Sequence, residues 1–313
     1  MSTSTEQLEI ITNAPISTWY RIGGRADRFA QPGSNEQLLQ CLELDPDLKV
    51  LGEGANLLVD DSGEPNLVVS LQTDGFKAIE IDQTTGLVCA GAGVPLPRLI
   101  SKTINSGFGG LQGLAGFPAT IGGACIMNAG GRYGSIGDHI IQVHAMDRAG
   151  RMHELKRSDI DFDYRQSGLN HLLICSVVFQ LTPGDPLVLK EELTECMHYK
   201  KQSQPMSEKS AGCAFKNPTL TDPIDSIGQA GDRVSAGMLI DRAQCKGMTV
   251  GGASVSPIHA NFITTTSDAK AREVIELMDQ VRIRVLDTFG VDLKNEVVIW
   301  SRDETLPISE VTR

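Results

Sequence analysis

Hydrophobic side chains recur every three or four positions over residues 271–289, and this spacing predicts the clearest helix of the chain. We expect a cap at Ser267 or Asp268 and an end at Gly290, because glycine readily takes the left-handed conformation that follows a helix. Such an apolar stripe is typical of a helix that packs against a core. We therefore assign it to packing and not to a cofactor site.

Weaker periodic segments predict a mixture of helices and strands. A capping-box pattern at Ser34 opens a helix over residues 34–44, and Pro95 with Pro97 begins another helix that Gly107 ends. Runs of β-type residues bounded by turn residues predict strands over residues 49–51, 67–71, 76–81, 87–90, 139–147 and 171–181. This mixture indicates an α+β fold.

Residues 183–186 contain two prolines and a glycine, a composition typical of a linker. Helical spacing resumes over residues 187–201, and a polar, loop-like segment follows over residues 202–210. The chain has 313 residues, and a domain usually holds roughly 100 to 200. We therefore expect several domains, with the last boundary at this linker.

The charge of the chain narrows the choice of partners. With 28 basic and 39 acidic side chains, the formal charge of −11 disfavours nucleic acid and anionic membranes. No apolar stretch reaches the ~20 residues of a membrane span, and the start lacks a basic leader. The seven cysteines show neither a Cys-x-x-Cys pair nor a disulfide spacing. We expect a cytoplasmic monomer that binds no metal, nucleic acid or membrane.

Glycine is concentrated over residues 107–137, where it fills eleven of thirty-one positions and Arg132 is the only basic residue. Glycine lets a backbone approach a ligand closely, so that successive N–H groups can converge on a pyrophosphate. The segment therefore fits an anionic dinucleotide. It fits a set of tight turns in a glycine-rich β layer equally well.

A second glycine loop covers residues 51–57, but it does not complete a familiar nucleotide motif. Leu57 occupies the third glycine position of a Rossmann fingerprint, and no alternating strand and helix series follows. The glycines of residues 91–93 fail likewise, and the chain has no Gly-Lys pair for a P-loop. His153 and Glu154 lack the second histidine of a zinc protease. Three common enzyme classes are thereby disfavoured.

Several short motifs together resemble one family. They are RIGG at 21–24, LGEGANLL at 51–58, GLAGFPATIGGA at 113–124, MNAG at 127–130, YR at 164–165, SAGCAFKNP at 210–218, SAGMLID at 235–241, KG at 246–247, GGA at 251–253, HANF at 259–262 and NEV at 295–297. In this order, from about residue 13 to residue 300, they resemble the UDP-N-acetylenolpyruvoylglucosamine reductases of bacterial cell-wall synthesis.

The resemblance implies an α+β architecture with FAD as cofactor and NADPH as reductant. It implies the two-subdomain FAD-binding fold of the vanillyl-alcohol-oxidase type, over residues 1–73 and 74–186. A C-terminal α+β substrate domain over 187–303 and a tail over 304–313 would follow. The residues implied to hold FAD are Gly52, Glu53, Gly54, Ala55, Asn56, Leu57, Gly116, Pro118, Ala119, Thr120, Gly122, Gly123 and Asn128.

The implied reaction reduces the enolpyruvyl ether of a UDP-sugar, with hydride from flavin N5 adding to the terminal methylene. Arg165 then suits the enolate, because a guanidinium stays charged and matches a carboxylate with two hydrogen bonds. Glu296 would assist it. In isolation, Arg165 fits an ordinary surface arginine and Glu296 a solvated acid at a strand edge. Because Arg165 and Glu296 lie in motifs that resemble those of the family, the resemblance favours catalytic roles for both.

Cys213 stands where the family usually has a serine proton donor. A free thiol with a pKa of about 8.5 is mostly protonated at neutral pH and is a stronger acid than a serine hydroxyl. Cys213 can therefore supply the proton, unless Lys216 nearby converts it to a thiolate. Outside the family context, Cys213 fits a small buried hydrophobic residue.

The resemblance also implies substrate contacts, although the residues leave some of these open. Lys216 and Asn217 fit the phosphates or the sugar, and Tyr164 precedes the implied catalytic arginine. His259 and Asn261 fit a structural role equally well. The chain lacks the tyrosine-bearing insertion that clamps the UDP group in one class of the family, and the weak candidates to replace it are Tyr199, Lys200 and Lys201. Two rival functions are an oxidase on the same fold and a non-catalytic flavin-binding module.

Overall fold

A computed structural model describes residues 8–302 of the chain, and these residues form two compact units. The first unit combines the chain up to Ala14 with Ala26–Glu53 and Pro65–Tyr199. The second combines Pro15–Arg25, Gly54–Glu64 and the chain from Lys200 onward. The expected boundaries after residues 73 and 186 stay predictions, and the expected tail at 304–313 lies outside the described residues.

The first unit contains a four-stranded sheet in which β3 and β5 run parallel. In spatial order its strands are β1 (Ile10–Pro15), β2 (Arg25–Ala30), β5 (Glu64–Ser70) and β3 (Lys49–Leu51). Helix α1 (Asn35–Leu44) begins where the Oγ of Ser34 accepts a hydrogen bond of 3.3 Å from the N–H of Gln37. The predicted helix and its cap are confirmed.

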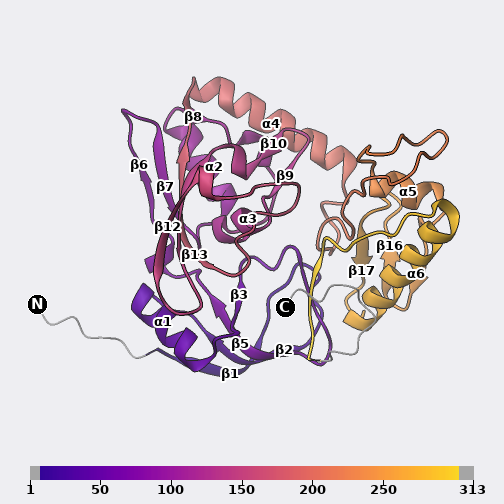
Figure 1. The fold of residues 1–313 in the computed structure, drawn as a ribbon, viewed down its shortest axis with the longest axis horizontal. Coiled ribbons are helices and arrows are strands. Elements are labelled where there is room, and N and C mark those ends of the chain that lie inside the picture. Colours follow the sequence, from indigo (N-terminus) through magenta and orange to yellow (C-terminus); the bar gives the residue numbers. More distant parts are fainter. Residues whose placement is uncertain (1–7, 303–313) are drawn as a thin grey trace, which may run out of the picture. The chain divides into compact units, whose positions relative to one another are not determined.

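A five-stranded antiparallel sheet forms the larger part of the first unit (Figure 1). In spatial order its strands are β12 (Met152–Lys156), β11 (Ile140–Met146), β13 (Leu173–Gln180), β7 (Leu87–Gly91) and β6 (Ile79–Ile81). Apolar side chains of α2 (Leu96–Asn105) and α3 (Ile121–Ile126) join those of β7 and β13 in one hydrophobic core. The strands predicted over residues 87–90, 139–147 and 171–181 are confirmed within two residues at each end.

Short elements and one long helix complete this unit. The short ones are η1 (Asp74–Phe76), β8 (Phe108–Gly109), η2 (Gln112–Leu114), β9 (Gly130–Gly131), β10 (Gly134–Ser135), η3 (Ile136–Asp138), η4 (Arg157–Asp159) and β14 (Thr182–Pro183). The long helix is α4 (Pro186–Ser203), which confirms the helix predicted over residues 187–201. The strand predicted over residues 76–81 is wrong in its first half, because the N–H of Phe76 bonds to the carbonyl of Thr73 in a tight turn.

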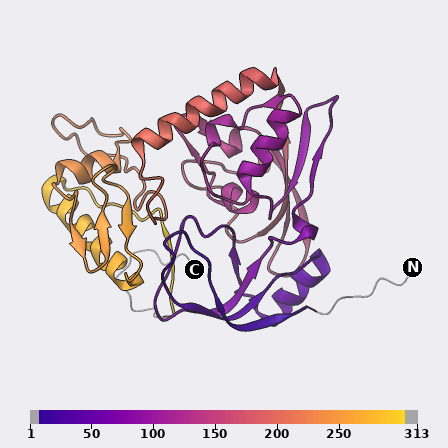
Figure 2. The same cartoon turned by 180° about the vertical axis from the view of Figure 1, so that it is seen from behind.

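The second unit has its own hydrophobic core, and Figure 2 shows its elements from behind. They are β4 (Leu57–Val59), α5 (Ala236–Arg242), β15 (Thr249–Val250), β16 (Ala253–Val255), β17 (Ile263–Thr265), α6 (Ala271–Phe289) and β18 (Val298–Trp300). Strands β4 and β18 pair in parallel, and β15, β16 and β17 form an antiparallel sheet. Helix α6 packs its apolar stripe into this core, as its spacing predicts.

The cap of α6 differs from the prediction. The N-cap residue is Lys270 and not Ser267 or Asp268. The carboxylate of Asp61 accepts hydrogen bonds of 3.1 Å from the N–H groups of Ala271 and Arg272. An acidic side chain distant in sequence therefore accepts hydrogen bonds from the N–H groups of the first turn, and a local pattern cannot reveal such a partner.

Within residues 8–302, no helix has the length and hydrophobicity to cross a membrane.

Candidate active site

Two of the glycine loops predicted to hold a cofactor meet in the first unit. A Cβ on Gly52 would lie 2.8 Å from Oγ1 of Thr120, so glycine is required for this approach. The side chain of Gln72 donates a hydrogen bond of 3.0 Å to the carbonyl of Gly52, and the N–H of Gly123 bonds to Oγ1 of Thr120 at 3.3 Å. Hydroxyl and backbone groups thus gather where the two loops meet.

The other residues of this predicted set occupy the same loop or its flanks. Gly116 has φ +74°, and the carbonyl of Ala119 accepts a hydrogen bond of 2.8 Å from the N–H of Leu96. The N–H of Gly122 donates to the carbonyl of Ala92. Gly116, Pro118, Ala119 and Gly122 are half-buried, so their backbone remains partly accessible. Glu53 is half-buried too and follows Gly52 directly.

Asn128 links this loop system to the turn that carries Arg165. Its amide donates a hydrogen bond of 2.8 Å to the carbonyl of Asp163 and accepts one of 3.1 Å from the N–H of Gly137. The side chain is buried, and the residue has φ +42°, a conformation that asparagine tolerates better than most residues. Its predicted contact with the cofactor stays a prediction, and the structure gives it a positioning role.

Arg165 itself has a left-handed backbone with φ +56°. It occupies a turn closed by hydrogen bonds between Asp163 and Gln166, and its guanidinium lies 5.1 Å from the ring centre of Tyr164. A non-glycine residue in this conformation stores strain, and such strain is concentrated at functional sites. The sequence contained no signal for this conformation.

In the second unit, a backbone ladder joins three predicted site segments. The N–H of Glu296 donates a hydrogen bond of 2.8 Å to the carbonyl of Ala214, next to Cys213. The side-chain amide of Asn56 donates one of 2.9 Å to the carbonyl of Glu296. Gly54, Ala55 and Leu57 flank Asn56, and Leu57 begins β4. The predicted cofactor loop, the acid and the proton donor are therefore tied together within one unit.

Asn261 holds the Cys213 segment from its other side. Its amide accepts a hydrogen bond of 3.0 Å from the N–H of Phe215 and donates one of 2.8 Å to the carbonyl of Phe215. Its own carbonyl accepts one of 2.7 Å from the N–H of Ala214. Asn261 is buried, so these bonds position the site, and its predicted contact with substrate stays a prediction.

The remaining predicted substrate residues border the same segment. The N–H of Lys216 donates to the carbonyl of Lys294, and Oδ1 of Asn217 accepts a hydrogen bond of 2.9 Å from the N–H of Ala236 at the start of α5. Burial lowers the pKa of His259, whose Nδ1 accepts a hydrogen bond from the N–H of Asn261. A neutral His259 is required for that bond, because protonation would remove the acceptor.

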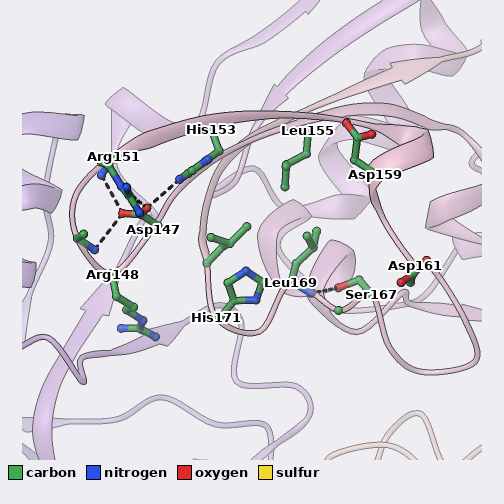
Figure 3. Close-up of a pocket in the computed structure, with 13 residues that line it drawn as sticks. Asp147, Arg148, Arg151, His153, Leu155, Asp159, Asp161, Ser167, Leu169 and His171 are labelled. Atoms are coloured by element: carbon green, nitrogen blue, oxygen red, sulfur yellow. Dashed lines mark hydrogen bonds and ion pairs between the residues drawn. The ribbon is translucent and has the colours of Figure 1, made fainter.

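A separate open cavity of about 630 Å³ lies in the first unit beside the turn between β11 and β12 (Figure 3). At this turn, the carboxylate of Asp147 accepts hydrogen bonds from Arg151 and from His153, each 2.8 Å long. These bonds, that of His153 first, hold the pKa of Asp147 well below its usual range. None of the predicted site residues lines this cavity, so we assign it a structural role.

The loops fit an anionic dinucleotide cofactor. The approach of Gly52 to Thr120 leaves no room for a Cβ, and the half-buried glycines of the loop leave their backbone partly accessible. A carboxyl, a thiol and an amide stand on one ladder in the second unit. Such groups can bind a polar substrate and transfer a proton.

Comparison with known proteins shows which family this chain resembles. An FAD binding domain model matches residues 26–156, and the C-terminal domain model of UDP-N-acetylenolpyruvoylglucosamine reductase matches residues 204–300. The reductase of Moorella thermoacetica is 38% identical over 301 residues, which cover 94% of this chain and 94% of that protein. The chain belongs to the UDP-N-acetylenolpyruvoylglucosamine reductase family.

Other members of this family are also similar to the chain. The reductase of Azorhizobium caulinodans is 36% identical over 295 residues, which cover 92% of this chain and 91% of that protein. The crystal structure of the reductase from Thermus caldophilus matches with a TM-score of 0.78 and 33% identity, covering 94% of this chain and 99% of that chain. The α+β fold with its FAD-binding part of the vanillyl-alcohol-oxidase type is thus confirmed.

As a UDP-N-acetylenolpyruvoylglucosamine reductase family member with an FAD-binding domain, the protein is an FAD-containing oxidoreductase. The alternative of a non-catalytic flavin-binding module is set aside. Two contributors to the site were missed in the sequence. The carbonyl of Asp163 accepts a hydrogen bond from the amide of Asn128, and the carbonyl of Ala214 accepts one from the N–H of Glu296. Both contacts use main-chain atoms of these two residues, so no side-chain type indicates them in the sequence.

Proposed function

We propose that the protein reduces UDP-N-acetylglucosamine enolpyruvate to UDP-N-acetylmuramate with electrons from NADPH, a step in peptidoglycan precursor synthesis. Family membership supports the substrate class, and the observation that carries the proposal is the ladder joining Asn56, Glu296 and Ala214. It ties a cofactor-loop residue to an acid and to the neighbour of a thiol. This set of groups matches a reduction that adds a hydride and a proton.

Bound FAD, once reduced by NADPH, would supply the hydride for the terminal methylene of the enolpyruvyl group. Gly52, Thr120 and the half-buried loop around Gly116 would hold its pyrophosphate through backbone and hydroxyl groups. Gly54 and Asn56 would also contribute.

Arg165 would bind the carboxylate of the enolpyruvyl group. Addition of a hydride to the methylene leaves negative charge on the adjacent carbon, and that charge spreads onto the carboxylate as an enolate. A guanidinium stabilises this charge with two parallel hydrogen bonds. The left-handed backbone at Arg165 supports the role, because the hydrogen-bonded turn between Asp163 and Gln166 holds the arginine in this strained conformation.

Cys213 and Glu296 would complete the reaction. Cys213 would donate its thiol proton to the carbanion carbon, which forms the C–H bond and leaves a thiolate that solvent reprotonates. Glu296 would donate a hydrogen bond to the enolate oxygen while it carries a proton. Cys213 is half-buried, so a substrate can reach it and solvent can restore its proton.

Substrate binding would involve further residues. Tyr164, Lys216 and Asn217 would contact the sugar or the phosphates, whereas His259 and Asn261 would hold the loop that supports them. We propose that the protein acts as a monomer in the cytoplasm, a reducing compartment that suits seven cysteines without a disulfide spacing.

Product analysis tests this function. The purified protein, loaded with FAD, is incubated with NADPH and UDP-N-acetylglucosamine enolpyruvate, and the product is identified by mass spectrometry. We expect a product heavier by two hydrogen atoms and one NADPH consumed per product. NADPH consumption that continues without the enolpyruvyl substrate and depends on oxygen would instead identify an oxidase and reject the proposal.

A further inference from the structure

A guanidinium held by two tyrosine rings stands on the tip of the β9–β10 hairpin. The Arg132 guanidinium carbon lies 5.2 Å from the ring centre of Tyr199 on α4 and 6.0 Å from that of Tyr133. The two rings meet edge to face at 6.1 Å. Tyr133 and Tyr199 are 49% and 39% exposed, so the cluster faces solvent.

The positively charged guanidinium of Arg132 is available to bind an anionic ligand. In the described part of the chain, no carboxylate or carbonyl accepts a hydrogen bond from its guanidinium, which is exposed. Stacking against a ring uses the face of a guanidinium and leaves its N–H edge available for an anion. In a chain of net charge −11, a cation fixed in this way favours a local anionic partner.

The hairpin is anchored beside the predicted cofactor loop. A Cβ on Gly113 would lie 2.7 Å from that of Tyr133, so the missing side chain lets Tyr133 pack on η2. Past the base of the hairpin, the N–H of Gly137 bonds to Asn128, whose amide also holds the turn of Arg165. Arg132 and the proposed enolate anchor Arg165 thus belong to one connected frame.

We propose that the cluster of Arg132, Tyr133 and Tyr199 binds the nucleoside pyrophosphate of the UDP-sugar substrate, a role that rests on the proposed function. The guanidinium edge meets the phosphate oxygens, which accept its charge-assisted hydrogen bonds. A tyrosine ring stacks with the uracil, because an exposed aromatic face suits a flat base. NADPH also carries a pyrophosphate and flat bases, so the test must separate the two ligands.

Binding of UDP to the FAD-loaded protein tests the proposal without requiring catalysis. In Arg132→Met, which keeps a long apolar stem, we expect the Kd for UDP and the KM for the UDP-sugar to rise about tenfold, the effect of losing one charge-assisted contact. The Kd for NADPH, kcat and Tm should stay close to those of the unaltered protein. Arg132→Lys should recover part of the affinity, because it keeps the charge.

Arg157→Met is the matched control. Its guanidinium also lies over a ring, 5.0 Å from the centre of Phe162, but Nη1 donates to the carbonyl of Ile160. This variant should bind UDP normally. Unchanged UDP affinity in Arg132→Met, or an equal loss of affinity for NADPH, would overturn the proposal. If UDP binding depends on Arg132 but no reduction occurs, the proposed function fails, and only the binding of a nucleoside pyrophosphate by this cluster is retained.

Discussion

Single residues in this protein have functions that depend on unusual local geometry. Arg165 has a left-handed backbone, and the turn between Asp163 and Gln166 keeps it there. Cys213 follows Gly212, which has φ +78°, and precedes Ala214, whose carbonyl bonds to Glu296. In both places the backbone conformation determines the position of a reactive side chain. Conservative substitutions of Arg165 and Cys213 should therefore change the rate of the reaction more than the stability of the fold.

Arg165→Lys tests the proposed enolate anchor. Lysine keeps the positive charge but cannot form two parallel hydrogen bonds with a carboxylate. We expect kcat to fall about 100-fold, consistent with the loss of one preorganised donor in the transition state. Tm should change little. Steady-state kinetics with thermal melting measures both, and a kcat near that of the unaltered protein would remove Arg165 from the mechanism.

The pH dependence of turnover tests Cys213 as proton donor. A free thiol ionises at a pH of about 8.5, and a thiolate cannot donate a proton, so activity should decline on the alkaline side. Cys213→Ser should move this decline to higher pH, because a serine hydroxyl does not ionise in that range. Cys213→Ala should abolish product formation. An identical pH profile in the serine variant would reject the assignment.

At the scale of elements, the second unit is held together around the Cys213 segment by bonds between distant parts of the chain. Asn261 bonds to both backbone groups of Phe215, and Glu296 bonds to Ala214. The segments around Asn261 and Glu296 do not form regular strands beside the Cys213 segment. Side-chain hydrogen bonds and isolated backbone bridges therefore take the place of a sheet. The buried amide of Asn261 therefore contributes to the position of the segment that carries the thiol.

Asn261→Ala tests that dependence. The substitution leaves the buried N–H and carbonyl of Phe215 without their partner, which costs about 1 to 3 kcal/mol for each unsatisfied group. We expect a lower free energy of unfolding in urea and a strongly reduced kcat. Asn217→Ala is the comparison, because its amide accepts a hydrogen bond from the N–H of Ala236 at the start of α5. Equal stability of Asn261→Ala and the unaltered protein would contradict the account.

Sequence patterns predicted the elements that depend on local periodicity. Helix α6 and the cap of α1 follow from residues close in sequence, so both were found. Helix α3 was missed because two of its six residues are glycines, which have a low helix propensity. The cap of α6 was placed wrongly because its partner, Asp61, is distant in the sequence.

The candidate site was predicted from family motifs, and its supporting bonds were not. The motifs named Asn56, Cys213 and Glu296 but gave no reason for their association. The structure supplies one: the side-chain amide of Asn56 bonds to the carbonyl of Glu296, and the N–H of Glu296 bonds to the carbonyl of Ala214. The acceptors are main-chain carbonyls, which every residue possesses, so the sequence contains no specific signal for the partners.

At the scale of the whole molecule, each unit has its own hydrophobic core, and stability should also depend on a buried carboxylate. The side chain of Asp60 is fully buried and pairs with Arg272 in the second unit. Burial raises its pKa, but hydrogen bonds from Ser62 and the pairing with Arg272 outweigh this effect and lower the pKa overall. Asp60 therefore stays ionised at neutral pH.

Acid denaturation tests this pair. Because the pKa of Asp60 is lower in the folded than in the unfolded protein, its stabilisation is complete above the unfolded value of about 3.9 and is lost as pH falls through the folded value. Asp60→Asn should lower the free energy of unfolding at pH 7 by about 1 to 3 kcal/mol. The difference should shrink below a pH of about 4. A difference independent of pH would show that the charge contributes nothing.

The two half-reactions, observed separately, test the central claim most directly. NADPH is added without oxygen to the FAD-loaded protein, the flavin absorbance is followed until it disappears, and UDP-N-acetylglucosamine enolpyruvate is then added. We predict that NADPH bleaches the flavin and that the enolpyruvyl substrate restores its absorbance with formation of UDP-N-acetylmuramate. A reduced flavin that stays bleached with that substrate, and recovers only when oxygen is admitted, would contradict the account.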